Sequence, residues 1–255
     1  QNGNMRLGKT EKDREALEEL QSGKADTVTV TVPEGYTVRQ IAGVLKEAGV
    51  EGADQFEETA ASYGPLKYQY GPVAVPIKAE GFLFPDTYQI PRSYTAKQIC
   101  DVMYKRTDEV LSPQIREEAK KKNISLHDLM TLASMVEREA RFREDQVPIA
   151  SVMLRRLREG MPLQIDATIQ YILGSPKAEL SISDTRIESP YNTYLHPGLP
   201  PGPIGAPGAD AIMAVLNADP GEYLYYVAQA DGHHVFTKTY EEHQAETENI
   251  YGSSE

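Results

Sequence analysis

The strongest limit on the fold of this 255-residue chain is a stretch rich in proline and glycine. Residues 197–208, PGLPPGPIGAPG, contain nine prolines or glycines in twelve positions. Proline has a fixed φ angle and no backbone N–H to donate, and glycine disfavours both helix and strand. This density predicts a stiff loop of defined shape, so the regular elements must lie on either side of it.

Composition and charge exclude several classes of protein. The sequence is 40% hydrophobic and 25% charged, as in ordinary folded domains, and its formal net charge is −12. We therefore expect no nucleic-acid partner and no docking on anionic lipid, because both need a basic surface. The single cysteine, Cys100, can form no internal disulfide and offers no cysteine cluster for zinc.

The N-terminal third predicts a small module behind a polar segment. Residues 1–26 form that polar N-terminal segment. Alternating valines and threonines over 28–32 predict a half-buried strand, followed by a Pro-Glu-Gly turn. A helix is predicted from its N-cap, Thr37, to Gly49, and a second short helix comes after it. Strand, helix and helix in so short a span predict a separate module over 27–77.

The remaining residues, 78–255, predict a larger domain of helices and one β-hairpin. The hairpin turns at Asp231-Gly232, and Thr239 with Glu242 forms a capping box that begins a closing helix. Hydrophobic periodicity places the other helices at 95–107, 112–121, 125–141, 147–159 and 167–173. The predicted fold class is α+β, with the small module preceding a mixed helix and hairpin domain.

One glutamate stands where helical spacing calls for an apolar side chain. In the helix that starts at Ser125, Glu137 falls inside the apolar stripe. A carboxyl in an apolar wall has a raised pKa and suits general acid/base catalysis. The alternative is an ion pair with Arg141, one turn later. Glu139 points to the opposite side, towards solvent, with Arg143 as its partner.

Other polar and aromatic residues are candidates for holding a ligand. Gln164 has no evident structural role, whereas Asp166 precedes an apolar helical run and suits an N-cap. Asp86 follows a proline as turn residues do, with Tyr88 close by. The last group, beside the Pro/Gly stretch, is Tyr191, Asn192 and Tyr194, whose aromatic faces and amide suit a sugar.

The sequence predicts no metal site and no cofactor. His233 and His234 are adjacent in a predicted strand and face opposite ways, so they cannot bind one metal ion together. No GxSxG motif and no phosphate-binding glycine loop is present. The candidates that remain are one well-placed carboxyl group, several amides and several aromatic side chains. By elimination, this set favours a reaction on a carbohydrate.

Five blocks of sequence resemble one known family. They are AEGFLFPDTY, LASMVEREA, RRLREGMPLQIDATIQYILG, SPYNTYLHPGLPPGPIGAPG and YLYYVAQADGHHVFTKTYEEH. Their order and spacing over about residues 27–250 resemble the YceG-like family of endolytic murein transglycosylases. The resemblance implies cleavage of peptidoglycan glycan strands between N-acetylmuramic acid and N-acetylglucosamine, leaving a 1,6-anhydro end. It places the catalytic glutamate at Glu137 and implies that residues 27–77 are a LysM-like subdomain.

A single carboxyl suffices for that reaction, since the sugar's own C6 hydroxyl is the nucleophile. One residue protonates the leaving oxygen and then takes the hydroxyl proton, so its pKa must lie near the working pH. For holding the glycan strand, the substrate-binding set that we expect is Gln164, Asp166, Tyr191, Asn192, Tyr194, Asp86, Tyr88 and His234.

The resemblance also implies a location. Family members usually begin with a membrane-spanning helix, but no apolar run here approaches the roughly 20 residues that a bilayer requires, and the chain begins at Gln1. We therefore expect the extracytoplasmic part of a single-pass protein of the bacterial cell membrane, with partners in the cell-wall synthesis machinery.

Two rival functions remain open at the level of sequence. The first is a peptidoglycan hydrolase that pairs Glu137 with a second carboxylate, from Asp86, Asp166 or Glu80. The second is a non-catalytic peptidoglycan-binding module in which Glu137 is merely paired with Arg141.

Overall fold

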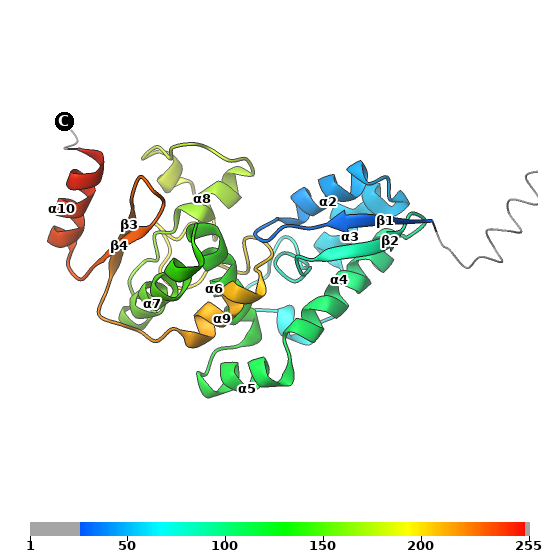
Figure 1. Ribbon diagram of the computed structural model, residues 1–255, viewed down its shortest axis with the longest axis horizontal. Coiled ribbons are helices and arrows are strands. Elements are labelled where there is room, and N and C mark those ends of the chain that lie inside the picture. The colour runs from blue at the N-terminus through cyan, green and yellow to red at the C-terminus, as the bar shows by residue number, and fades with distance from the viewer. Residues whose placement is uncertain (1–25, 253–255) are drawn as a thin grey trace, which may run out of the picture.

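The computed structural model describes residues 26–252, and its chain forms two parts that share a core (Figure 1). The first part is built around a two-stranded antiparallel sheet of β1 (Thr27–Thr31) and β2 (Thr87–Pro91). Val30 lies opposite Tyr88 in this sheet and both are buried, as the alternating valines predict. The predicted strand is confirmed, whereas its partner β2 follows a segment that we predicted only as a turn.

Short helices pack around this sheet. α2 (Val38–Glu47) begins at Thr37, which forms a capping box with Gln40. The 3₁₀ helix η1 (Glu51–Gln55), α3 (Phe56–Ser62) and η2 (Lys67–Gln69) follow, so both predicted helices are confirmed. α4 (Ala96–Val110) packs against η1 and α3.

The predicted module boundary near residue 77 stays a prediction, but the packing crosses it. The strand partner of β1 comes from 87–91, and α4 covers helices of the first seventy residues. A two-stranded sheet needs such a cover, because two strands alone bury too little apolar surface.

The second part is arranged around α6 (Leu126–Glu139), whose N-cap is Ser125. It packs against α7 (Arg143–Glu159), α8 (Asp166–Leu173) and α9 (Ala209–Asn217), and α5 (Pro113–Lys121) leads into it. The predicted helices are confirmed with shifted ends, while α9 was not predicted. α7 begins at Arg143, before the predicted start at 147, and it contains Pro148, which has no N–H to donate to the carbonyl of Glu144.

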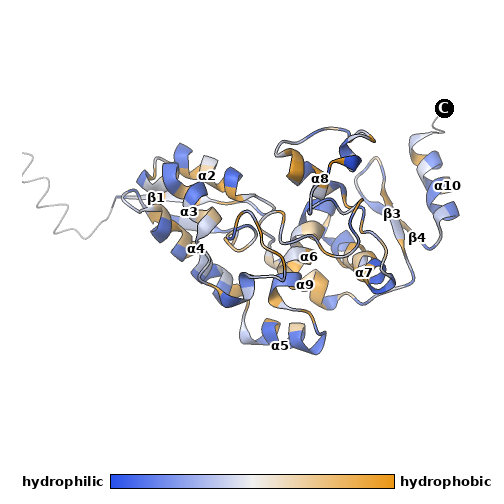
Figure 2. Cartoon of the chain, turned by 180° about the vertical axis from the view of Figure 1, so that it is seen from behind, coloured by the Kyte–Doolittle hydropathy of each residue, from blue (hydrophilic) through white to orange (hydrophobic). Residues whose placement is uncertain are grey.

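The C-terminal elements agree with the sequence pattern. β3 (Tyr225–Ala228) and β4 (His234–Thr237) form the predicted hairpin, and α10 (Tyr240–Tyr251) begins with the predicted capping box of Thr239 and Glu242. α10 has no fully buried residue, and Figure 2 shows mostly hydrophilic residues along it. Within residues 26–252, none of the helices has both the length and the apolar character that a membrane crossing requires.

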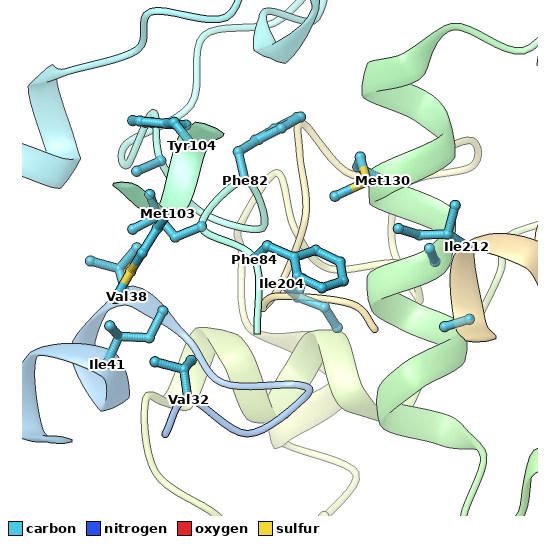
Figure 3. Close-up of a cluster of buried hydrophobic side chains, with 14 of the residues drawn as sticks. Val32, Val38, Ile41, Phe82, Phe84, Met103, Tyr104, Met130, Ile204 and Ile212 are labelled. Carbon is cyan, nitrogen blue, oxygen red and sulfur yellow. The ribbon is translucent and has the colours of Figure 1, made fainter. Parts of the chain in front are cut away.

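The Pro/Gly stretch is a loop, as predicted, and most of it is buried between the two parts. The backbone of Ala206 exchanges two hydrogen bonds with the β1–α2 turn, from Gly35 N–H at 2.7 Å and to Tyr36 O at 2.8 Å. On its other side, Ser134 of α6 accepts from Ile204 N–H at 3.0 Å. Figure 3 shows Phe84 and Ile204 between the valines of the first part and Met130 of α6. The loop therefore fixes the two parts to each other.

Candidate active site

A polar hollow of about 470 Å³ lies where the C-terminal end of α6, the start of α8, the hairpin and α10 meet. We name it the Glu139 hollow. Its polar and aromatic lining consists of Glu139, Arg156, Gln164, Asp166, Tyr194, Tyr225, Tyr226, His234, Tyr240, His243 and Tyr251. Aromatic faces beside carboxyl, amide and imidazole groups suit a polyhydroxylated ligand such as a sugar.

Glu139 has an enclosed carboxyl group with two neutral hydrogen-bond donors. Ala167 N–H donates to Oε1 at 3.2 Å, and the Tyr226 hydroxyl donates to Oε2 at 3.0 Å. Burial raises the pKa of Glu139 to about 7, and the charge of Asp166 adds to this rise. A carboxyl of this kind can give up a proton and take one back near neutral pH.

The expectation that Glu139 faces solvent beside Arg143 is wrong. Arg143 pairs instead with Asp210 at 2.7 Å, and Glu139 is enclosed by α8 and the hairpin. Helical periodicity identifies one buried face, but the last turn of α6 is covered on two sides. The sequence signal that could have found Glu139 is its place within a block that the resemblance rests on.

Glu137 lies on the other side of the same helix end. Its Oε2 accepts from Gly208 N–H, the N-cap residue of α9, at 3.0 Å. The pKa of Glu137 is raised to about 7, mainly by burial, and the charges of Glu34 and Asp210 contribute to this rise. Glu137 is not part of the lining of the Glu139 hollow. It is positioned as a cap on α9, where a carboxylate meets the positive end of the helix.

The alternative ion pair of Glu137 with Arg141 does not form. Within the described part of the chain, no basic group lies within 4.0 Å of the Glu137 carboxylate, and the Arg141 guanidinium lies 5.6 Å from the centre of the Phe142 ring. The only hydrogen-bond partner found there for the Glu137 carboxylate is therefore a backbone N–H.

Four of the residues predicted to bind substrate line the Glu139 hollow together. The Tyr194 hydroxyl donates to Asp166, which is the first residue of α8 rather than its N-cap. Gln164 has a left-handed backbone (φ 54°), and its Oε1 accepts from Arg156 at 3.3 Å. His234 Nδ1 lies 3.0 Å from Asp145 Oδ2, which orients the imidazole ring.

The other four predicted residues lie outside that lining. Asn192 is fully buried, and its amide donates to Thr185 O and Ile187 O at 3.1 and 2.8 Å, so it braces the loop before Tyr194. Tyr191 packs against the Tyr171 ring, and the Tyr88 hydroxyl donates to Phe84 O. Asp86 accepts from Arg106 at 2.7 Å at the start of β2. These groups are engaged in holding the fold.

Several residues of the hollow were missed by sequence reasoning. Arg156 donates to the backbone carbonyls of Leu163 and Leu224, at 2.8 and 2.7 Å, and so ties the α7–α8 loop to the hairpin. Tyr225 and Tyr226 come from a hairpin strand that carried no residue-level signal for a site. Their place is set by tertiary packing, which periodicity does not contain.

Comparisons with known proteins agree with this architecture. The model of the YceG-like family matches residues 1–249. Proteins named endolytic murein transglycosylase are 36% identical over 94% of this chain in Streptococcus pneumoniae (serotype 2, strain D39) and 41% identical over 68% of it in Bacillus subtilis (strain 168). The chain spans 49% and 48% of these two relatives, so about half of their length.

A solved structure shares the fold as well. The crystal structure of a yceG-like protein from Listeria monocytogenes superimposes with a TM-score of 0.79 at 32% sequence identity, over 91% of this chain and 80% of that one. The mixed arrangement of helices and small sheets, α+β, is thus shared with a family structure. On the extent of the sequence match, this chain belongs to the YceG-like family.

Proposed function

We propose that this chain is a lytic transglycosylase that cleaves the glycan strands of peptidoglycan internally, between N-acetylmuramic acid and N-acetylglucosamine. Family membership and the names of its relatives support the reaction class. The observation that carries the proposal is the Glu139 carboxyl, enclosed at a polar, aromatic hollow with its pKa near 7.

One carboxyl can perform both proton transfers of this reaction. Glu139 in its protonated form donates to the bridging oxygen, and the bond from that oxygen to C1 of the muramic acid breaks. The carboxylate so formed takes the proton of the C6 hydroxyl of the same sugar. The C6 oxygen then forms a bond to C1. The product is a 1,6-anhydro end, no water is consumed, and the glutamate returns to its starting form. An intramolecular hydroxyl needs no second catalytic carboxylate, provided that the ring is held in place.

The geometry favours Glu139 over Glu137, the residue that the sequence pattern selects. Both have a pKa of about 7, so the proton affinity does not separate them. Glu139 shares a hollow with Gln164, Asp166 and Tyr194, whereas Glu137 accepts from the Gly208 backbone outside that hollow. A general acid must reach the oxygen that it protonates, so position decides the assignment.

The matched pair Glu139→Gln and Glu137→Gln tests this assignment. Purified peptidoglycan is digested with the parent and each variant, and the fragments are analysed by mass spectrometry for anhydro ends, which are lighter by one water. We expect anhydro products from the parent, a loss of about 100-fold or more for Glu139→Gln and a small change for Glu137→Gln. Loss in Glu137→Gln alone, at unchanged thermal stability, would return the catalytic role to Glu137.

A two-carboxylate hydrolase is the second candidate, because Asp166 lines the same hollow as Glu139. Its products carry reducing ends, so the same spectra distinguish the two reactions. A non-catalytic binding module would release no fragments at all. Glu80, another hydrolase candidate, bonds to Val38 N–H at 3.0 Å and is absent from the lining of the hollow.

The resemblance supports further proposals about the whole protein. Residues 27–77 form a LysM-like subdomain, and the chain is the extracytoplasmic portion of a membrane-anchored protein. Partners in cell-wall synthesis would then act on the same glycan strands. Membrane fractionation of the full-length protein, followed by co-purification of the proteins bound to it, tests the anchoring and partner proposals.

A further inference from the structure

A second hollow of about 780 Å³ lies next to the Glu139 hollow. Both hollows are lined by Asp166, Tyr194 and Tyr251, so these three side chains form the passage between them. The far wall of the second hollow is the segment 178–185, which follows α8. A ligand that fills both hollows must therefore cross these three side chains on its way from the enclosed glutamate past α8.

The far wall is built by specific contacts although it has little regular structure. Asp184 accepts from Lys177 Nζ and from the backbone N–H of Ser181, the latter at 2.6 Å. Gln170 of α8 exchanges two hydrogen bonds with the Lys177 backbone, at 2.7 and 2.8 Å. Asn192 donates to Thr185 O and so holds the end of the segment. The hollow is therefore a defined shape rather than a gap beside a loose loop.

Apolar side chains lie among the polar ones in this wall. Ile182 is 72% exposed, and it lines the second hollow together with Leu180. Covering an exposed aliphatic group gains free energy, and the C–H faces of sugar rings can provide such a cover. Polar side chains around it, among them Gln170 and Thr185, can bond hydroxyl and acetamido groups.

We propose that the second hollow binds further sugars of the glycan strand whose cleavable bond lies at Glu139. The inference rests on the proposed function and extends it: the strand passes between Tyr194 and Tyr251, with Ile182 packing against a sugar ring some distance from the reacting bond. A strand held on both sides of the passage is cut internally, because nothing in this arrangement selects its end.

The test compares long un-cross-linked glycan strands with a muramic-acid-containing tetrasaccharide that is too short to fill both hollows. The variants are Ile182→Ser, which removes the apolar contact, and Ala178→Glu, which places bulk and charge in the second hollow. Val73→Ser is the control, since Val73 is 52% exposed and lines neither hollow. We expect KM for long strands to rise about fivefold in both variants, with kcat and the tetrasaccharide kinetics unchanged.

Binding is measured separately, without cleavage, by titrating each protein with β-1,4-linked N-acetylglucosamine oligomers of four and of eight sugars. We expect the parent to bind the longer oligomer more tightly and the two variants to lose that gain. Equal effects on short and long substrates, or none in either assay, would overturn the proposal. Parent protein that binds the longer oligomer with this gain but releases no anhydro fragments would instead refute the proposed reaction and leave the binding inference standing.

Discussion

At the scale of single residues, Glu137 and Glu139 have similar pKa values, but their carboxyl groups are enclosed by different elements of the fold. Glu137 accepts from the N-cap of α9 beside Glu34, and Glu139 accepts from α8 and the hairpin beside Asp166. A raised pKa marks both as unusual but does not say which one meets a substrate. The lining of the Glu139 hollow makes that distinction, because it includes Glu139 and not Glu137. The role of each glutamate therefore follows from its surroundings and not from the sequence motif alone.

Two neighbours of Glu139 shift its pKa in opposite directions, which gives a paired prediction. The Asp166 charge raises the pKa of Glu139, whereas the Tyr226 hydrogen bond to its carboxylate lowers it. Because the reaction begins with protonated Glu139, kcat/KM falls as pH rises through that pKa. Asp166→Asn should move this falling limb to lower pH and Tyr226→Phe to higher pH, each by about 0.5–1 pH unit.

The measurement is kcat/KM for glycan strands between pH 5 and 9. Tyr223→Phe is the control, since Tyr223 lies outside the lining of the hollow. Shifts of the same sign in Asp166→Asn and Tyr226→Phe would show that the limb reports another group. Limbs that do not move at all would contradict Glu139 as the titrating acid.

Gln164, Asp166, Tyr194 and His234 are four of the eight residues predicted to bind substrate, and all four line the hollow. Their contact with a glycan strand stays a prediction. Glu139 was misplaced because its cover comes from a hairpin almost ninety positions later. Asn192 was a fair candidate for a ligand by residue type, but its amide is used up by the loop that it holds.

At the scale of elements, capping residues and hydrophobic periodicity predict the helices, but they do not predict which strands pair with each other. The N-cap at Thr37 and the capping box at Thr239 place two helix starts correctly, because the residues that form a cap lie within four positions of each other. The strand β2 and the helix α9 were missed, since the first depends on β1 some sixty positions earlier and the second begins directly after the Pro/Gly loop. The rigid loop was predictable, whereas what it packs against was not.

The fit between that loop and the segment before β2 gives an element-scale prediction. Gly81 has φ 79°, and a Cβ added there would lie 2.2 Å from Cβ of Pro203. The proline ring cannot rotate away, so Gly81→Ala must separate the two segments as well as strain the backbone. We expect Gly81→Ala to lower the free energy of unfolding by about 3 kcal/mol or more.

Gly160 is the matched control for this substitution. It has φ 69° at the end of α7, but nothing lies within 4 Å of an added Cβ. Gly160→Ala should therefore cost only the backbone strain, about 1–2 kcal/mol. Denaturant titration measures both variants, and equal losses would mean that the contact with Pro203 has no energetic weight.

At the scale of the whole molecule, the two parts of the chain are one folded body because the Pro/Gly loop and the segment around Phe84 are buried between them. The contact between the two parts also explains why the carboxyl group of a third glutamate, Glu80, is buried. Glu80 is 3% exposed, accepts from Val38 N–H at the start of α2 and from the Tyr171 hydroxyl of α8, and so joins both parts. Burial raises its pKa to about 7 as well.

The pH dependence of stability follows from these three glutamates. Their folded pKa values, about 7, lie above the ordinary value of 4.5, so between these pH values the folded protein binds more protons than the unfolded chain. The contribution of these groups to stability is therefore highest at the acidic end of this window, falls across it, and levels off above pH 7. We expect the free energy of unfolding to drop between pH 5 and pH 8, by about 1–3 kcal/mol for each enclosed glutamate.

Glu80→Gln isolates one contribution, because the amide oxygen still accepts from Val38 N–H while the titration is removed. The variant should lose part of the pH slope and be more stable than the parent at pH 8, where the parent must keep an enclosed carboxylate. Glu51→Gln, at an exposed glutamate, should leave the slope unchanged. Chemical denaturation at pH 5 and pH 8 measures all three proteins. A Glu80→Gln variant with the same pH slope as the parent would contradict the enclosure of the Glu80 carboxyl, since removing a raised acidic pKa must reduce the fall in stability with pH.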